Sequence, residues 1–191
     1  MKRTSTDAEY LDTGKLVIDA DGIPVDLGHR GVGSPEGKIA APVGSVYTDT
    51  AATNGAIRWI KTSGTGNTGW RVEYGDTGWR DITSSIPSEN LKSGAVYIRR
   101  AQDLVSIRFV ALSSDIPART TVFTLPPGFR PDNSSNYDIS GYWGNHANTV
   151  AQISSNGAIG FRDTVSENTV NSINTVTTTS PWPTTLPGTP T

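Results

Sequence analysis

The part of the sequence with the clearest binding chemistry is Tyr142-Trp143-Gly144-Asn145-His146, where two aromatic rings stand beside two hydrogen-bonding side chains. Aromatic faces stack on sugar rings, and amide or imidazole groups hydrogen-bond to sugar hydroxyls. The candidate saccharide-binding residues are therefore Tyr142, Trp143, Asn145 and His146. Burial in a core or a subunit interface is the more frequent role of tryptophan, and it stays open as the alternative for Trp143.

No arrangement of residues predicts catalysis. The two histidines, His29 and His146, are far apart in the sequence and lie in polar surroundings that are typical of surface residues. Asp19–Gly22 resembles the start of a calcium loop but lacks the remaining ligands, and Gly64–Gly69 resembles a dinucleotide fingerprint without a βαβ unit around it. The absence of cysteine excludes disulfides and thiolate metal sites. We therefore predict no enzymatic activity, no metal and no cofactor.

The composition favours an all-β protein with many short strands. The 191 residues include 20 Gly and 12 Pro, with 35% hydrophobic and 18% charged residues. This balance is too apolar for a disordered chain and too poor in helix formers for a helical one. A net charge of −2 without a basic patch argues against nucleic-acid binding. No apolar run reaches the length of about 18 residues that a membrane helix needs, and we predict no membrane insertion and no signal peptide.

Residues 41–86 are predicted to form a small β domain. Asn54-Gly55 lies between two runs of alternating residues, which is a strong hairpin signal because both turn residues need a positive φ. A Thr-Gly-Trp-Arg tetrapeptide then occurs twice, around Trp70 and Trp79. We expect these two tryptophans and Trp59 to form the core of the domain or an oligomer interface, because buried aromatic rings dominate the stability of so small a core.

On either side of this domain the sequence predicts two extended arms and a larger β head. Residues 1–40 contain too few apolar residues for a core and are predicted to be an anchoring arm. Residues 87–180 alternate with period 2 and contain hairpin turns such as Asn156-Gly157, which favours a jelly-roll-like β-sandwich head. A proline corner is expected to anchor Phe129 in the core of the head. Residues 181–191 are punctuated by proline and are predicted to form an extended arm.

Residues 42–70 contain three short motifs in a fixed order. They are Pro-x-Gly-Ser at Pro42–Ser45, aromatic-x-Lys at Trp59–Lys61 and Gly-Thr-Gly-Asn-x-Gly-Trp at Gly64–Trp70. This set of motifs resembles that of the small domain of tail-fibre, tail-tip and head-fibre proteins of tailed bacteriophages. The continuation to about residue 165 resembles the β-rich head that often follows it. The resemblance implies a non-enzymatic structural protein of the virion surface, assembled in the host cytoplasm as a homotrimer.

Two placements on the virion follow from this resemblance. In the first, the chain is a capsid decoration or head-fibre protein whose N-terminal arm binds the major capsid protein. In the second, it is a tail-tip or tail-fibre receptor-binding protein whose arm binds other tail proteins and whose head binds a host cell-surface saccharide. The motif pattern shared with the family favours the tail slightly. The lack of a shaft favours the capsid, and so do the two arms, which need neighbouring subunits to hold them. From the sequence alone we expect the capsid placement.

Overall fold

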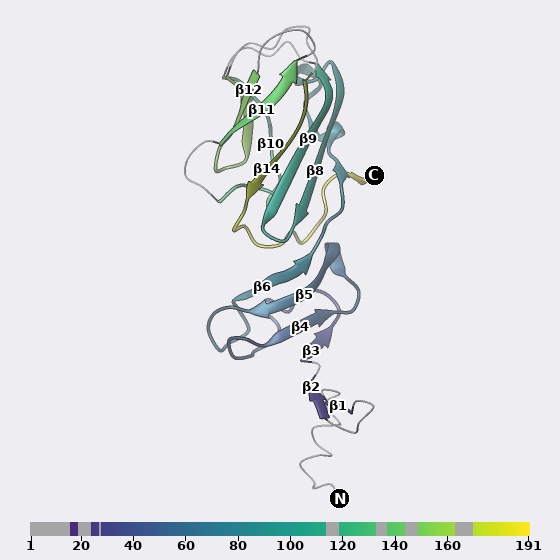
Figure 1. The fold of residues 1–191 in the computed structure, drawn as a ribbon, viewed down its shortest axis with the longest axis vertical. Helices are drawn as coiled ribbons and strands as arrows, with labels where there is room; N and C mark the ends of the chain where they lie inside the picture. The colour runs from purple at the N-terminus through teal and green to yellow at the C-terminus, as the bar shows by residue number, and fades with distance from the viewer. Residues whose placement is uncertain are drawn as a thin grey trace, which may run out of the picture. The chain divides into compact units, whose positions relative to one another are not determined.

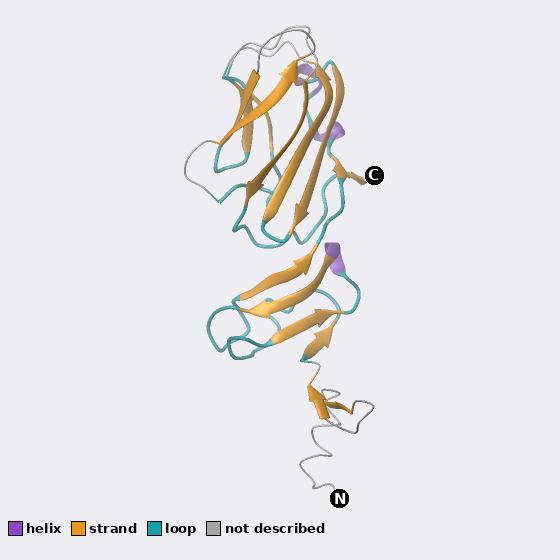
Figure 2. Cartoon of the chain, viewed as in Figure 1, coloured by secondary structure: helices purple, strands orange, loops and turns teal. Residues whose placement is uncertain are grey.

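The computed structural model describes residues 16–18, 24–26, 28–113, 119–132, 137–143, 149–162 and 170–191 (Figure 1). The chain divides into two compact units, Met1–Glu73 and Tyr74–Thr191, which we call the small unit and the head. In the described parts of both units strands dominate, and the helical elements are short 3₁₀ turns (Figure 2). The predicted all-β fold class is confirmed. No helix in these parts is long and apolar enough to cross a membrane.

The small unit contains a four-stranded sheet with the strand order β3-β4-β5-β6. Its elements are β3 (His29–Gly31), β4 (Val46–Asp49), the 3₁₀ turn η1 (Thr53–Gly55), β5 (Ala56–Lys61) and β6 (Trp70–Gly75). β4 and β5 form the predicted antiparallel hairpin, and Asn54 and Gly55 adopt positive φ angles of 53° and 80° in its turn. Nearer the N-terminus, β1 (Leu16–Ile18) and β2 (Pro24–Asp26) pair with each other in antiparallel fashion.

Residues 28–40 are part of the small unit, whereas the sequence predicted that they belong to an arm of residues 1–40. β3 pairs in parallel with β4, and the loop after β3 is held by a hydrogen bond of 2.8 Å from Gly37 N to Asn67 O. A parallel pair has no tight turn between its strands, so no local turn signal marks it in the sequence. Any N-terminal arm is therefore shorter than predicted.

The head contains a nine-stranded sheet, within the described residues, with the order β10-β13-β12-β11-β14-β9-β8-β7-β15. Its strands are β7 (Arg80–Asp81), β8 (Ser93–Ala101), β9 (Leu104–Ser113), β10 (Thr121–Thr124), β11 (Tyr137–Trp143), β12 (Thr149–Ile153), β13 (Ala158–Phe161), β14 (Val170–Thr177) and β15 (Thr189–Pro190). Two 3₁₀ turns, η2 (Thr83–Ser85) and η3 (Ser88–Asn90), lie between β7 and β8. The hairpins β8–β9 and β12–β13 turn at Gln102-Asp103 and Asn156-Gly157.

The sheet of the head folds over into two layers because β11 pairs differently along its length. Its first part, Tyr137–Gly141, pairs with β12, and its last two residues pair with β14 (Figure 1). Phe109 of β9 consequently meets Phe123 of β10 and Phe161 of β13, with ring centroids 6.4 Å and 6.5 Å apart. Such contacts between strands that are distant in the sheet order are those of a sandwich core. Jelly-roll connectivity and trimerisation stay predictions.

The core of the head follows from the alternation of its two longest strands. Val96 and Ile98 of β8 and their partners on β9 point inward, while the intervening residues face outward. The buried cluster comprises Ile82, Ile86, Val96, Ile98, Val105, Ile107, Phe109, Val122, Phe123, Leu125, Phe129, Ala151, Ile153, Ile159, Phe161 and Val176. Because Ile82 and Ile86 belong to it, the segment after Glu73 packs with the head. The boundary between the units therefore differs from the predicted one at residue 86.

Candidate functional site

The predicted saccharide-binding residues begin at the C-terminal end of β11. Tyr142 and Trp143 are its last two residues and pair with the first residues of β14. Asn145 and His146 lie outside the described residues, and the structure describes the backbone of Tyr142 and Trp143 but not their side chains. The fold therefore locates the start of the candidate site, and the contacts of its four side chains stay a prediction.

Several strand ends meet where the candidate site begins. Val170 of β14 pairs both with Trp143 of β11 and with Leu112 of β9. β8 starts beside the end of β9, where Ser93 pairs with Ser113. The loops at the ends of a β-sandwich commonly carry binding residues, because the rigid sheets hold these loops in position. The predicted residues thus start from one end of the head.

The tryptophans predicted to be core or interface residues divide between the two units. Trp59 and Trp70 are buried in the small unit, and the indole Nε1 of Trp70 donates a hydrogen bond of 2.8 Å to the carbonyl oxygen of Ile39. Trp79 is half-buried and lies in the head, so the two Thr-Gly-Trp-Arg tetrapeptides do not form one structural repeat. Phe129 is fully buried in the core of the head.

The three motifs of residues 42–70 interlock around Lys61. Gly44 N donates to Lys61 O, and Lys61 N donates to Ser45 O, each at 2.9 Å, which joins the first motif to the second. The Lys61 side chain is only 1% exposed, and its Nζ donates to the carbonyl oxygens of Ser63, at 2.5 Å, and Thr68. These bonds close the third motif over the lysine. The residues that carry the motif pattern are therefore the framework of the small unit.

The segment after β3 completes this framework. The Glu36 carboxylate accepts hydrogen bonds from Gly69 N (3.2 Å) and Trp70 N (2.8 Å). The Asn67 side chain donates to the Gly37 carbonyl oxygen at 2.9 Å. Buried or half-buried backbone groups of the third motif are thereby satisfied by residues that precede the first motif. The sequence motif and the segment before it form one closed structure.

Asp49 is a buried carboxylate with a structural role. Its oxygens accept hydrogen bonds from the backbone amides of Gly33 (2.9 Å), Ala51 (3.0 Å) and Thr53 (2.9 Å). Burial raises the pKa of Asp49, but these hydrogen bonds to the charged form outweigh burial and hold the pKa below its ordinary value. Burial, and next the charge of Asp49, raise the pKa of Tyr47. Asp49 therefore ties the turn after β4 to the segment after β3.

Arg100 is the residue of the head that sequence reasoning missed. It follows Val96 and Ile98 in the inward phase of β8, and its side chain is 3% exposed. Its guanidinium donates to the carbonyl oxygens of four residues, at distances of 2.7 to 2.9 Å. They are Gln102, Gly128, Ser180 and Pro181. Its Cζ also lies 4.9 Å from the ring centroid of Trp182. A basic residue in phase with buried aliphatic residues was the available signal.

These contacts fix the C-terminal segment, which the sequence predicted to be an extended arm of residues 181–191. Trp182 is buried, β15 pairs with β7, and Arg80 donates to the carbonyl oxygens of Pro187 (2.9 Å) and Gly188 (2.7 Å). The segment is extended, as its prolines indicate, but it is bound to the head of its own chain. It is not a free arm that needs a neighbouring subunit.

The described residues contain no group of three or more metal-ligating His, Asp or Glu side chains.

His29 is one of the two histidines of the chain. The centroid of its ring lies 6.3 Å from that of the Trp70 ring in an edge-to-face arrangement. This contact assigns His29 a packing role beside the core of the small unit.

No protein-family model matches the sequence, and no curated protein matches it significantly. Among solved structures, the chain is similar to the head domain of the lactococcal phage bIL170, described in a study of the receptor-binding domains of lactococcal phages. The match has 18% sequence identity, covers 55% of this chain and 98% of that chain, and has a TM-score of 0.36. A TM-score of this size carries no weight for function.

Proposed function

We propose that this chain is a non-enzymatic appendage protein on the surface of a tailed-phage virion and that its head recognises a host cell-surface saccharide. The observation that carries the proposal is the structure of the resembling motifs. Pro42–Ser45, Trp59–Lys61 and Gly64–Trp70 lock together around the buried Lys61 into one closed unit. The motifs shared with phage appendage proteins therefore belong to one folded unit of this chain.

The tail-tip placement is favoured over the capsid placement because residues from both predicted arms are bound within their own chain. Residues 28–40 pair within the small unit, and residues 181–191 are bound to the head. Two features of the sequence favoured a capsid decoration protein, namely the lack of a shaft and two arms that require neighbours. The contacts of residues 28–40 and 181–191 within the chain count against the second feature, and the motif pattern favours a receptor-binding protein of the tail.

Immunogold labelling of intact virions tests the placement. An antibody against the head is expected to label the tail end of the virion. Label over the capsid would overturn the receptor-binding placement in favour of a decoration or head-fibre protein. Purified virions without label would contradict the appendage proposal itself.

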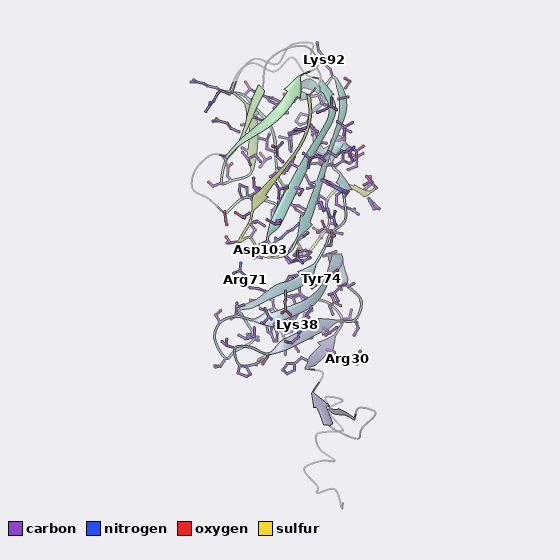
Figure 3. The ribbon with its side chains drawn as sticks, in the orientation of Figure 1. Arg30, Lys38, Arg71, Tyr74, Lys92 and Asp103 are labelled. Atoms are coloured by element: carbon purple, nitrogen blue, oxygen red, sulfur yellow. The ribbon has the colours of Figure 1, made fainter. Side chains whose placement is uncertain are left out.

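Competition for phage adsorption tests the role of the head. The purified chain is expected to block adsorption to host cells, and Trp143→Ala is expected to lose most of this effect because stacking of an aromatic ring on a sugar is removed. Tyr74→Ala is the matched control, because Tyr74 is an exposed aromatic residue outside the candidate site (Figure 3). Equal blocking by both variants and the wild type would exclude Trp143 from the site.

The homotrimer belongs to the same proposal. Trimerisation covers the edges of sheets, which otherwise pair with other chains. Sedimentation is expected to give three times the chain mass of 20.3 kDa. A stable monomer across the working concentration range would contradict this part of the proposal.

A further inference from the structure

The small unit contains a pocket of about 450 Å³ that is separate from the candidate site of the head. The pocket is lined by Gly28, His29, Gly44, Ser45, Val46, Thr48 and Arg58. None of the residues predicted to bind saccharide lines it. Its volume falls within the range of small-molecule sites, which is about 300 to 1,000 Å³.

The floor of the pocket is the outward face of β4. Tyr47 and Asp49 point into the small unit and are buried, so Val46 and Thr48 lie on the opposite, half-buried face. Thr48 is paired with Arg58 of β5 on one side and with Arg30 of β3 on the other. Directly paired residues share a face of a sheet. A hydroxyl is therefore flanked by two guanidinium-bearing residues, of which Figure 3 labels Arg30.

The polar groups of this face are available to a ligand. The hydroxyls of Ser45 and Thr48 form no hydrogen bond with other residues in the part of the chain that the structure describes. Arg58 is held by an ion pair of 2.7 Å between its Nε and Glu73 Oε2, while its side chain stays 54% exposed. The ion pair limits the orientations of the guanidinium, which reduces the entropy that a ligand would have to overcome.

Glycines keep the rim of the pocket free of side chains. Gly28 has a φ of +70°, and a Cβ there would lie 2.8 Å from the carbonyl oxygen of Val46. Gly44 has a φ of +90°, and no atom lies within 4 Å of the position its Cβ would take. The first glycine permits the close approach of two backbones, and the second leaves open space at the mouth. A ring-shaped ligand can approach β4 from this side.

We propose that this pocket binds a saccharide unit that carries one anionic group, either a phosphate or a carboxylate. The two hydroxyls match sugar hydroxyls, which donate and accept hydrogen bonds. Arg58, which lines the pocket, matches an anion, because guanidinium groups bind phosphate and carboxylate with paired hydrogen bonds, and Arg30, which pairs with Thr48, adds a second positive charge beside the lining. No carboxylate lines the pocket, and Arg58 pairs with Glu73 through its Nε, so its two Nη groups can donate to the anion. The pocket does not depend on saccharide recognition by the head.

The test is titration of the full-length chain, labelled with ¹⁵N, with four probes followed by NMR. Glucose 6-phosphate and glucuronic acid are expected to shift amide signals around β3, β4 and β5 with dissociation constants on the order of 1 mM. Glucose and inorganic phosphate, each of which lacks half of the proposed contacts, are expected to bind about tenfold more weakly. Added salt is expected to weaken binding of the anionic sugars.

Variants separate the pocket from other surfaces. Arg58→Gln is expected to weaken binding of the better anionic sugar about tenfold, and Thr48→Val about fivefold. Arg30→Gln leaves the Arg58–Glu73 ion pair in place and is expected to weaken binding as well. Lys38→Gln removes a positive charge from an exposed residue of the same unit and is the control, expected to leave binding unchanged. Thermal unfolding of each variant checks that it is folded.

Four outcomes would overturn the proposal. They are binding of glucose as tight as that of glucose 6-phosphate, binding of inorganic phosphate as tight as that of the sugar phosphate, no response to any probe up to about 10 mM, and shifts that the pocket variants leave unchanged. Because the readout is the small unit, failure here is distinct from failure of the head, which Trp143→Ala tests.

Discussion

The small unit and the head each bury a basic side chain among their described residues. The two side chains donate hydrogen bonds to chain segments that differ in their distance along the sequence. Lys61 donates to the carbonyl oxygens of Ser63 and Thr68, which are close to it in the sequence. Arg100 donates to Gln102 nearby but also to Gly128, Ser180 and Pro181. The lysine closes one local loop, whereas the arginine joins segments that are about 80 residues apart.

The difference reflects the size of the two cores. The small unit has few buried aliphatic residues, so aromatic rings and a closed hydrogen-bonded loop supply its order. The head has a large apolar cluster, and its buried cation instead fixes the proline-rich C-terminal segment and contacts the ring of Trp182. A guanidinium with five donors suits the second task, because it can satisfy carbonyl oxygens in several directions. The smaller ammonium group of Lys61 suits the closure of one short loop.

The largest expected effect in this comparison is that of Arg100→Met. The substitution leaves several buried carbonyl oxygens without donors, and we expect it to lower the free energy of unfolding by about 3–5 kcal/mol. Hydrogen exchange measured by mass spectrometry should show that residues 178–191 lose protection while residues 28–70 keep theirs. Loss of protection spread evenly over both units would contradict a role confined to the head.

Lys61→Met is expected to have the next largest effect, because it keeps the buried stem and removes two hydrogen bonds. We expect a loss of about 2–3 kcal/mol in the stability of the small unit. Exchange protection should fall at residues 62–70 and stay unchanged at the C-terminal segment, which is the reverse of the result for Arg100→Met. If the two variants gave the same exchange pattern, the contrast between local and long-range closure would not hold.

Asp49→Asn tests the small unit through pH. The folded pKa of Asp49 lies below its unfolded value, so the carboxylate contributes stability above the unfolded pKa, about 3.9, and loses it as the pH falls through the folded pKa. We expect the variant to be about 2 kcal/mol less stable than the wild type at pH 7. The gap should shrink as the pH falls below about 4. Urea unfolding at several pH values measures it, and a gap independent of pH would contradict the assignment.

Arg99→Gln is expected to have the smallest effect, and it is the matched control for Arg100→Met. Arg99 points outward from β8 and forms an ion pair with Asp76, in which hydrogen bonding to Arg99 is the main reason that the pKa of Asp76 is lowered. Exposed pairs contribute little, so we expect a loss of less than about 1 kcal/mol that diminishes further in high salt. Urea unfolding in low and high salt checks this, and a loss equal to that of Arg100→Met would remove the distinction between the two faces of β8.

Strands and turns of the fold were predictable because their signals are local. Asn54-Gly55 and Asn156-Gly157 turn the hairpins as expected, and Val96 and Ile98 are buried in the alternation that the period of two indicates. A positive φ and a period of two are properties of adjacent residues. The saccharide-binding role of Tyr142 and Trp143 stays a prediction.

The tertiary structure alone decided which distant segments pack together. Residues that are remote in the sequence meet in the parallel pair of β3 and β4, in the contacts of Arg100 with the C-terminal segment and in the pocket on β4. The division of the chain after Glu73 likewise follows from such contacts. No turn chemistry or periodicity encodes such pairings, since their stability depends on the whole core. The sequence by itself determined an all-β chain with hairpins at given turns and a resemblance to phage appendages. Where its arms end and which polar groups it leaves open depended on the packed units.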